Sequence, residues 1–215
     1  MKLRSTMPSG LAVAAVIAVG SALTSCGQAT QAPEQPTAIA KENAKMRSEV
    51  PLTRPLDLSQ SGDIVNLEFN LPPPGPNAAP NLMLGMRIVR PDAESVIALS
   101  DAIRSGLDGR VSLVRIEGAK DTLVMLVRSS RDLRERLPIA EDGAFPGITT
   151  AGVDTSSLQD AGLTEAGTSS EVLMFAAAEN IAPGRYRLVV NLPQPHPQFR
   201  GESMELLVAY FGKGK

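Results

Sequence analysis

Few side chains in this sequence have the types and spacing needed for covalent or metal chemistry. The chain has one cysteine, Cys26, and one histidine, His196, which excludes a conventional zinc site of cysteine and histidine ligands after Cys26. A Ser-His-Asp arrangement would have to use His196, and no serine has the glycine pattern of a nucleophile elbow. Asp154, Asp160 and Glu165 lack the spacing of a calcium loop. The two carboxylates of a glycosidase can be far apart in sequence, so the sequence does not exclude such a pair. We predict no catalytic residues, no metal and no cofactor.

Cys26 follows a leader with the parts of a secretory signal peptide. Lys2 and Arg4 give the N-terminus a positive charge, and Leu11 to Leu23 is an uncharged apolar run. As a helix this run would span only about 20 Å, short of the roughly 30 Å hydrocarbon core of a bilayer. The pattern therefore favours a signal peptide over residues 1–25 rather than a transmembrane helix.

The residues Leu23-Thr24-Ser25-Cys26 resemble the lipobox of bacterial lipoproteins. The resemblance implies cleavage before Cys26, a diacylglycerol on its thiol and acylation of the new N-terminus; an ordinary signal peptide or anchor is the alternative. Two or more acyl chains anchor a protein stably, so we expect the protein to be attached to a membrane through the lipid on Cys26. Gly27, in the Gram-negative sorting pattern, favours the outer membrane, facing the periplasm.

The composition separates a tether from a folded domain. Residues 26–50 are polar and rich in proline, alanine and glutamine, and too poor in large apolar side chains to offset the entropy of ordering. We predict a lipidated N-terminus and flexible linker there, followed by one domain over residues 51–215. The formal net charge of −2 and the 3% aromatic content argue against a nucleic-acid partner.

The apolar pattern of the domain is mostly of period two, which indicates strands. The expected strands are Ile64–Leu71, Asn81–Val89, Val111–Ile116, Thr122–Val127, Glu171–Ala177, Tyr186–Leu192 and Ser203–Phe211. Apolar residues recur at helical spacing only over Pro91–Leu107, where Asp92 is a candidate N-cap. Arg128–Leu137 is ambiguous, and Gly143–Ser170 is expected to be a long loop, disordered rather than functional.

These elements predict a mainly β fold, an antiparallel sandwich of two layers with one or two short helices. Pro183-Gly184 followed by Tyr186 at the start of a strand resembles the tyrosine corner of immunoglobulin-like sandwiches. We therefore expect an immunoglobulin-like β-sandwich.

The segment Pro193–Glu202 looks most like a recognition surface. Its alternating prolines hold the chain extended, which would present His196, Phe199 and Arg200 as weak candidate binding residues. The alternative, which we favour, is that Phe199 closes one end of the sandwich, that Arg200 pairs with Glu202 or a carbonyl group, and that the prolines only stiffen the connection.

Several segments resemble a family of uncharacterised proteobacterial lipoproteins whose β-sandwich domain has no known function. They are Leu56–Ser59, Val65–Phe69, Val111–Ile116, Ile181–Leu188 and Pro197–Gly201. The resemblance covers most of Pro51–Phe211 and implies no catalytic residues.

Two functions are compatible with these features. One is a membrane-anchored lipoprotein whose non-catalytic sandwich binds a protein partner, either an envelope protein or a toxin that it neutralises as an immunity or inhibitor protein. The alternative is a structural or assembly accessory of the envelope that pairs through exposed strand edges. An acidic loop surface would favour the first, and a long unprotected edge strand the second.

Overall fold

The computed structural model describes residues 46–118, 120–130, 135–164 and 166–213. The predicted signal peptide, Cys26 and most of the predicted linker lie outside the described residues.

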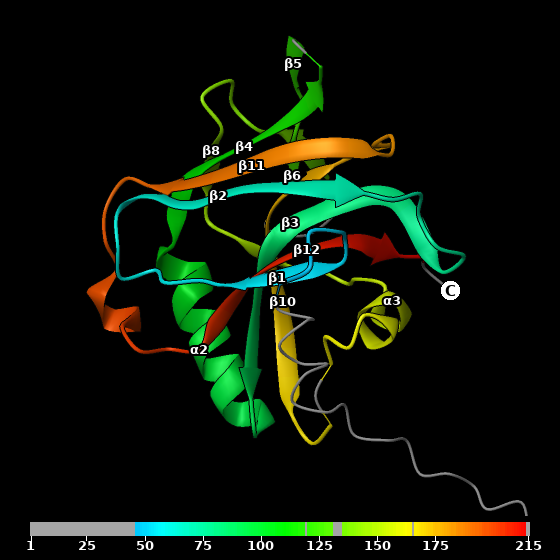
Figure 1. The fold of residues 1–215 in the computed structure, drawn as a ribbon. Helices are drawn as coiled ribbons and strands as arrows, with labels where there is room; N and C mark the ends of the chain where they lie inside the picture. The colour runs from blue at the N-terminus through cyan, green and yellow to red at the C-terminus, as the bar shows by residue number, and fades with distance from the viewer. Residues whose placement is uncertain (1–45, 119, 131–134, 165, 214–215) are drawn as a thin grey trace, which may run out of the picture. The chain divides into compact units, whose positions relative to one another are not determined.

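The described residues form two antiparallel sheets that lie face to face (Figure 1). The larger sheet has the order β1 (Leu52–Pro55), β12 (Met204–Gly212), β3 (Ala78–Arg90), β10 (Ser169–Ala178), β6 (Val127–Ser129) and β7 (Arg136–Pro138), with β9 (Thr149–Thr150) also paired to β10. The smaller sheet has the order β2 (Gly62–Leu71), β11 (Gly184–Leu192), β4 (Asp108–Glu117) and β5 (Lys120–Leu123), with β8 (Ala144–Pro146) also paired to β4. The predicted mainly β, antiparallel sandwich is confirmed.

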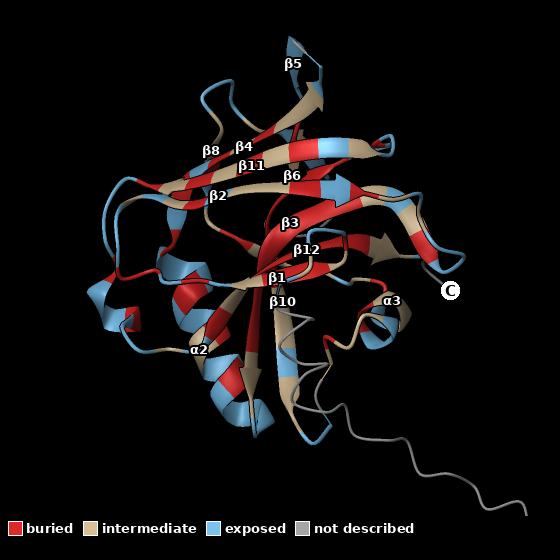
Figure 2. Cartoon of the chain, viewed as in Figure 1, coloured by how far each residue is buried: buried red, intermediate tan, exposed pale blue. Residues whose placement is uncertain are grey.

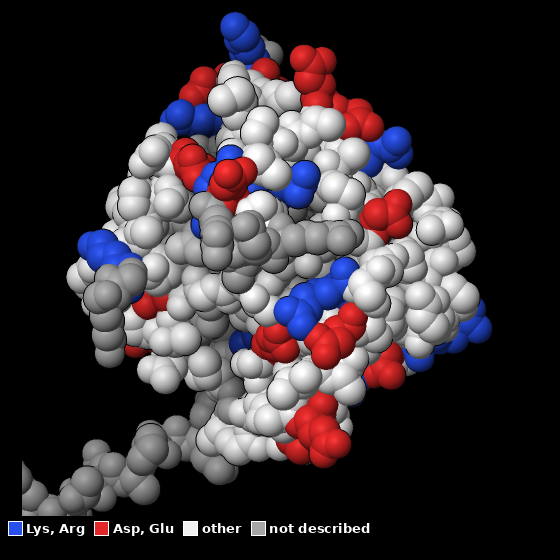
Figure 3. All heavy atoms as spheres, turned by 180° about the vertical axis from the view of Figure 1, so that it is seen from behind, with Lys and Arg blue, Asp and Glu red and all other residues white. Residues whose placement is uncertain are grey.

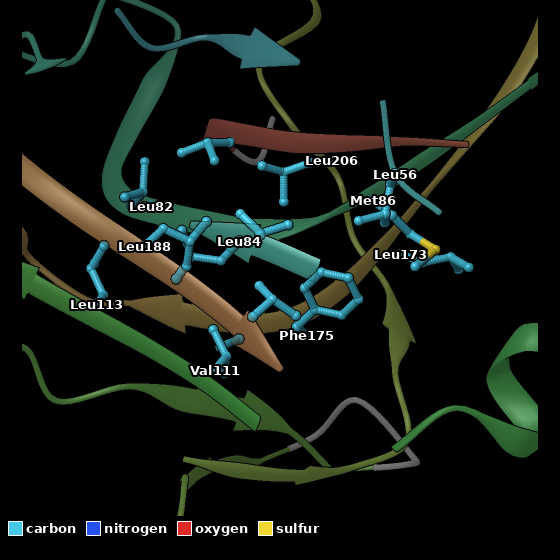
Figure 4. Packing of buried hydrophobic residues seen from close by; sticks show 14 of the residues in the cluster. Leu56, Leu82, Leu84, Met86, Val111, Leu113, Leu173, Phe175, Leu188 and Leu206 are labelled. Atoms are coloured by element: carbon cyan, nitrogen blue, oxygen red, sulfur yellow. The ribbon is translucent and has the colours of Figure 1, made fainter. Parts of the chain in front are cut away.

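The core lies between the sheets and consists of the alternate residues that each strand turns inward. Figure 4 shows Leu84 and Phe175 of the larger sheet packed toward Leu113 and Leu188 of the smaller one, and all four side chains are buried. In the smaller sheet the buried residues follow the period of two that indicated the strands, whereas β3, β10 and β12 are buried on both faces over most of their length (Figure 2).

The tyrosine corner is present in the geometry that the sequence indicates. Tyr186 is buried in β11, and its hydroxyl donates a hydrogen bond to the carbonyl oxygen of Ala182 at 2.6 Å. The strand that follows, β12, crosses to the larger sheet instead of pairing with β11. The likeness to immunoglobulin domains therefore concerns the two-layer architecture and this corner, and it does not extend to the pairing of the strand that follows.

The predicted helix is α2 (Ala93–Gly106). The carboxylate of Asp92 accepts a hydrogen bond from the backbone N–H of Ser95 at 2.8 Å, which confirms its capping role. Val96 and Ile103 are buried against the sandwich, and α2 contacts β3 and β10. The helix thus covers one end of the core.

The segment after β4 differs from the prediction of one strand over Thr122–Val127. Pairing with β4 is regular only through β5, and Val124 adds one backbone bond, from its N–H to the oxygen of Leu113. The chain then crosses to the larger sheet, where β6 pairs with β7. The apolar run is continuous because its first part packs in the smaller sheet and its last part in the larger one. The sequence pattern therefore does not show where one strand ends and the next begins.

The prediction that Gly143–Ser170 is a loop without regular structure is wrong. The segment contains β8, β9 and the short helix α3 (Thr155–Asp160), whose N-cap is Asp154. Leu158 and Leu163 are buried in a second apolar cluster with Met83, Met174 and Leu207, on the outer face of the larger sheet. The isolated apolar residues of this segment therefore pack as a cover over one sheet, a role that periodicity does not reveal.

The folded domain begins slightly before the predicted boundary at Pro51. The backbone N–H of Val50 donates to the oxygen of Asn70 at 3.1 Å, and the N–H of Asn70 donates to Ser48 at 2.7 Å. Val50 is also buried in the core. The last residues assigned to the linker therefore belong to the domain.

Candidate functional site

The predicted lipidation site, Cys26, lies outside the described residues, so lipidation stays a prediction. None of the helices among residues 46–213 that the structure describes is long and apolar enough to cross a membrane.

The candidate recognition segment turns two of its three side chains inward. His196 and Phe199 are 4% and 5% exposed, and their rings lie 6.1 Å apart. Phe199 belongs to the main core and ends a short 3-10 helix, Pro197–Phe199, while the backbone N–H of His196 donates to the oxygen of Leu58. Only Arg200 is exposed.

The alternative in which this segment presents its aromatic side chains outward is therefore wrong, because both rings fill the end of the sandwich. The expected pair of Arg200 and Glu202 is not formed either, since Glu202 pairs with Arg90. The favoured interpretation, with Phe199 closing the sandwich, agrees with the burial.

A cavity of about 760 Å³ lies on the outer face of the larger sheet, beneath the cover formed by residues 150–164. Its floor holds an ion pair between Arg87 and Glu205, whose Nη2 and Oε2 atoms are 2.5 Å apart. Arg87 also donates to the oxygen of Leu163, so this buried guanidinium ties the cover to β3. Its lining includes the threonines Thr150, Thr155, Thr164 and Thr168.

The carboxylates near this cavity do not converge as a glycosidase pair requires. Glu205 is paired in register with Arg87 and shares its face of the sheet. Glu171 is paired in register with Ile88, whose side chain is in the core, so Glu171 occupies the opposite face. The ion pair of Glu205 with Arg87, which in turn bonds to Leu163, instead helps to hold the cover on the sheet.

The outer face of the smaller sheet has no covering layer among the described residues. One row across it runs from Glu68 through Arg187 and Val114 to Leu123, by the registers of adjacent strands. Glu68 accepts hydrogen bonds from Arg187 at 2.8 Å and from Arg185 at 2.5 Å. These bonds, that to Arg187 first, hold the pKa of Glu68 below its usual range.

The charged groups on this face are compensated. Arg187 also pairs with Asp121 at 3.2 Å, and the hydrogen bonds and charges of Glu68 and Asp121 raise the pKa of Arg187. On the side of the molecule that is seen from behind, Figure 3 shows acidic and basic side chains next to one another. These paired charges therefore do not form the acidic surface that would favour binding of a basic toxin.

An apolar patch lies at the edge of this sheet, which we call the β5 patch and define as Val114, Leu123 and Met125. Leu123 is 65% exposed and Met125 is 88% exposed, whereas Val114 beside them is half-buried. Val124, between the two, packs against the core, so alternation turns Leu123 and Met125 to the outside. Large exposed side chains gathered at one edge are typical of contact surfaces.

Sequence reasoning missed the β5 patch, although a signal was present. The run Thr122–Val127 is apolar at both alternating sets of positions, so one set must face outward if the strand is half-buried. Arg87 was missed as well, and its signal is a single charge within the apolar strand Asn81–Val89.

In the part of the chain that the structure describes, no group of three or more histidine, cysteine, aspartate or glutamate side chains is arranged to hold a metal ion.

No family model matches the chain, and a search of curated proteins found no relative. Among solved structures, a crystal structure of a protein from Sulfurospirillum deleyianum aligns with a TM-score of 0.37 and 13% sequence identity, covering 76% of this chain and 98% of that one.

Proposed function

We propose that this protein is a lipoprotein, anchored through Cys26 on the periplasmic side of the outer membrane, whose β-sandwich binds a protein partner without catalysing a reaction. The β5 patch is the observation that carries this proposal. Leu123 and Met125 expose apolar surface on a sheet face that none of the described residues covers, next to charges that already have partners. A protein surface with apolar side chains would remove this patch from water at little electrostatic cost.

The partner is expected to be an envelope protein with an apolar contact surface, because the paired charges of this face do not form the acidic surface that would favour a basic toxin. The compensated charges around Glu68 and Arg187 support an apolar contact more than a charge-driven one.

The test is affinity capture from an envelope extract with the whole chain, expressed in its own membrane and extracted in detergent. We expect one stoichiometric partner with the parent chain and its loss when Leu123→Ser and Met125→Ser are combined. Ile97→Ser is the matched control, because Ile97 is 56% exposed on α2. Equal capture by all three chains, or capture of nothing, contradicts the proposal.

Anchoring has its own test. Cys26→Ser is expected to leave the precursor uncleaved and to abolish labelling with a radioactive lipid precursor. Normal processing of the variant, together with an unlabelled parent chain, contradicts the lipoprotein proposal.

A further inference from the structure

The strand β5 forms an edge of the smaller sheet, and some of its backbone N–H and C=O groups do not bond to β4. Its pairing partner β4 receives the N–H of Val124 at the oxygen of Leu113, at 2.9 Å. In an antiparallel ladder the residues that bond to one neighbour alternate with those that point away from it. Lys120, Thr122 and Val124 therefore face β4, and the backbone groups of Asp121, Leu123 and Met125 face outward.

This outward edge is open among the described residues. None of them forms a backbone hydrogen bond with Asp121, Leu123 or Met125 on the side away from β4. All four residues of β5 are exposed, and the β4–β5 hairpin extends beyond the rest of the smaller sheet (Figure 1). The same edge positions carry the exposed side chains of the β5 patch.

The opposite edge of the same sheet, β2, is guarded in ways that β5 is not. Asn70 of β2 is already bonded on its outer side by Ser48 and Val50. The register shift between Val65 and Asp63 makes a bulge, which disturbs pairing along the edge. Bulges and occupied ends are the devices by which proteins protect edge strands. On β5 only the charges of Lys120 and Asp121 serve that purpose, and they lie at its beginning.

We propose that the partner contributes an extended strand that pairs with the open edge of β5 along Asp121–Met125. This inference rests on the proposed partner-binding function and specifies its geometry. The main-chain groups of Asp121, Leu123 and Met125 supply the hydrogen bonds. Apolar side chains at alternate positions of the incoming strand cover Leu123 and Met125, since cross-strand neighbours lie on one face.

A matched pair of substitutions at Asp121 separates strand pairing from a simple apolar contact. Asp121→Ala removes the carboxylate and its bond to Arg187 but keeps the backbone N–H. Asp121→Pro also removes the N–H, which faces away from β4, a position where edge strands accept proline. With Asp121→Ala as the reference, we expect Asp121→Pro to bind the partner about tenfold or more weakly.

The experiment uses the whole chain in detergent and the partner captured by the parent chain. Urea denaturation of both variants checks that Asp121→Pro is folded. A second measurement needs no variant. Amide hydrogen exchange in the complex of the parent chain is expected to slow at Asp121, Leu123 and Met125 and to stay unchanged at Thr122, which already bonds to β4.

The outcomes distinguish the two proposals. If the Leu123 and Met125 double variant loses the partner while Asp121→Pro keeps it, and exchange slows without alternation, strand pairing is overturned and partner binding stands. If the parent chain captures no partner, both proposals fail. Alternating protection together with selective loss in Asp121→Pro supports strand pairing.

Discussion

The hydroxyl of Tyr186 donates a 2.6 Å hydrogen bond to the carbonyl oxygen of Ala182, while its ring stacks on Phe69 with centroids 6.0 Å apart. One side chain thus fixes the turn between β10 and β11 and packs into the core. Ala182 is exposed, so water can replace the hydroxyl as a partner of its carbonyl group.

Tyr186→Phe is therefore expected to lower the free energy of unfolding by about 0.5–1.5 kcal/mol, the net value of a hydrogen bond whose acceptor can rehydrate. Urea denaturation measures this change. Tyr186→Leu, which also removes the ring stacked on Phe69, should cost more. A Tyr186→Phe chain as stable as the parent would show that the hydrogen bond contributes nothing, and equal losses for the two variants would show that the stacked ring contributes nothing.

Alkaline titration is expected to be delayed in the folded chain. Burial raises the pKa of Tyr210 to about 12 and raises that of Tyr186 above its usual range. An unfolded tyrosine ionises near pH 10, so the stability associated with these residues is fully present below about pH 10 and is lost as pH rises toward 12. The chain has two tyrosines and no tryptophan, so tyrosinate absorbance reports on this pair alone. A midpoint near pH 10 in folded protein would contradict the prediction, and Tyr210→Phe isolates Tyr186.

The ion pair of Arg87 and Glu205 is expected to hold the cover over the larger sheet. The two side chains are 9% and 22% exposed, and Arg87 also bonds to the oxygen of Leu163. Arg87→Met should cost about 2–3 kcal/mol, less than the roughly 3–5 kcal/mol of a fully buried pair, because Glu205 still reaches water. Limited proteolysis should then cut within residues 151–164. A matched surface control is Arg110→Met, whose pair with Asp142 is more than half exposed; equal effects would refute the role of Arg87.

Neighbouring residues of the Pro193–Glu202 segment should respond in opposite ways to truncation. Phe199→Ala is expected to destabilise the domain by about 3–5 kcal/mol, because it empties a place in the core. Arg200→Ala, at an exposed position, should stay within about 0.5 kcal/mol of the parent chain. Thermal denaturation compares the two. A stable Phe199→Ala chain that loses a ligand would restore the recognition role of this segment.

Two glycines give a sharper contrast. A Cβ at Gly85 would collide with the carbonyl oxygen of Leu173 in the neighbouring strand, so Gly85→Ala should destabilise the domain by about 1–3 kcal/mol. A Cβ at Gly106, at the end of α2, meets nothing within 4 Å. Gly106→Ala is expected to be neutral or to stabilise by up to about 1 kcal/mol. Equal denaturation midpoints of the two variants would contradict the close packing of β3 on β10.

The sequence was sufficient for the elements whose apolar period is long and regular. The strands β2, β3, β11 and β12 and the helix α2 all follow such periods, and the Asp92 cap and the Tyr186 corner have local signatures. The cover over the larger sheet could not be predicted, because Leu158 and Leu163 are separated apolar residues whose burial depends on a distant sheet.

The same distinction applies to the candidate site. Which of two apolar sets in Thr122–Val127 faces water is decided by the crossing from β5 to β6, and that crossing depends on tertiary pairing. His196 and Phe199 were candidates by residue type alone, and the hydrogen bond from His196 to Leu58 that turns the segment inward joins residues far apart in sequence.

The two ends of the described chain leave the domain at one turn. Val50 bonds to Asn70 before the proline-rich turn that joins β2 to β3, and Lys213 bonds to Asn77 after it. A linker that joins residue 213 to residue 46 would close the chain into a ring, and domains whose ends lie on the same side usually tolerate new termini elsewhere. Cutting the ring in the exposed turn around Gly75 would produce a permuted domain with both sheets unchanged. Its N-terminus, and therefore any membrane anchor placed there, would then lie at the beginning of β3 instead of beside the end of β2.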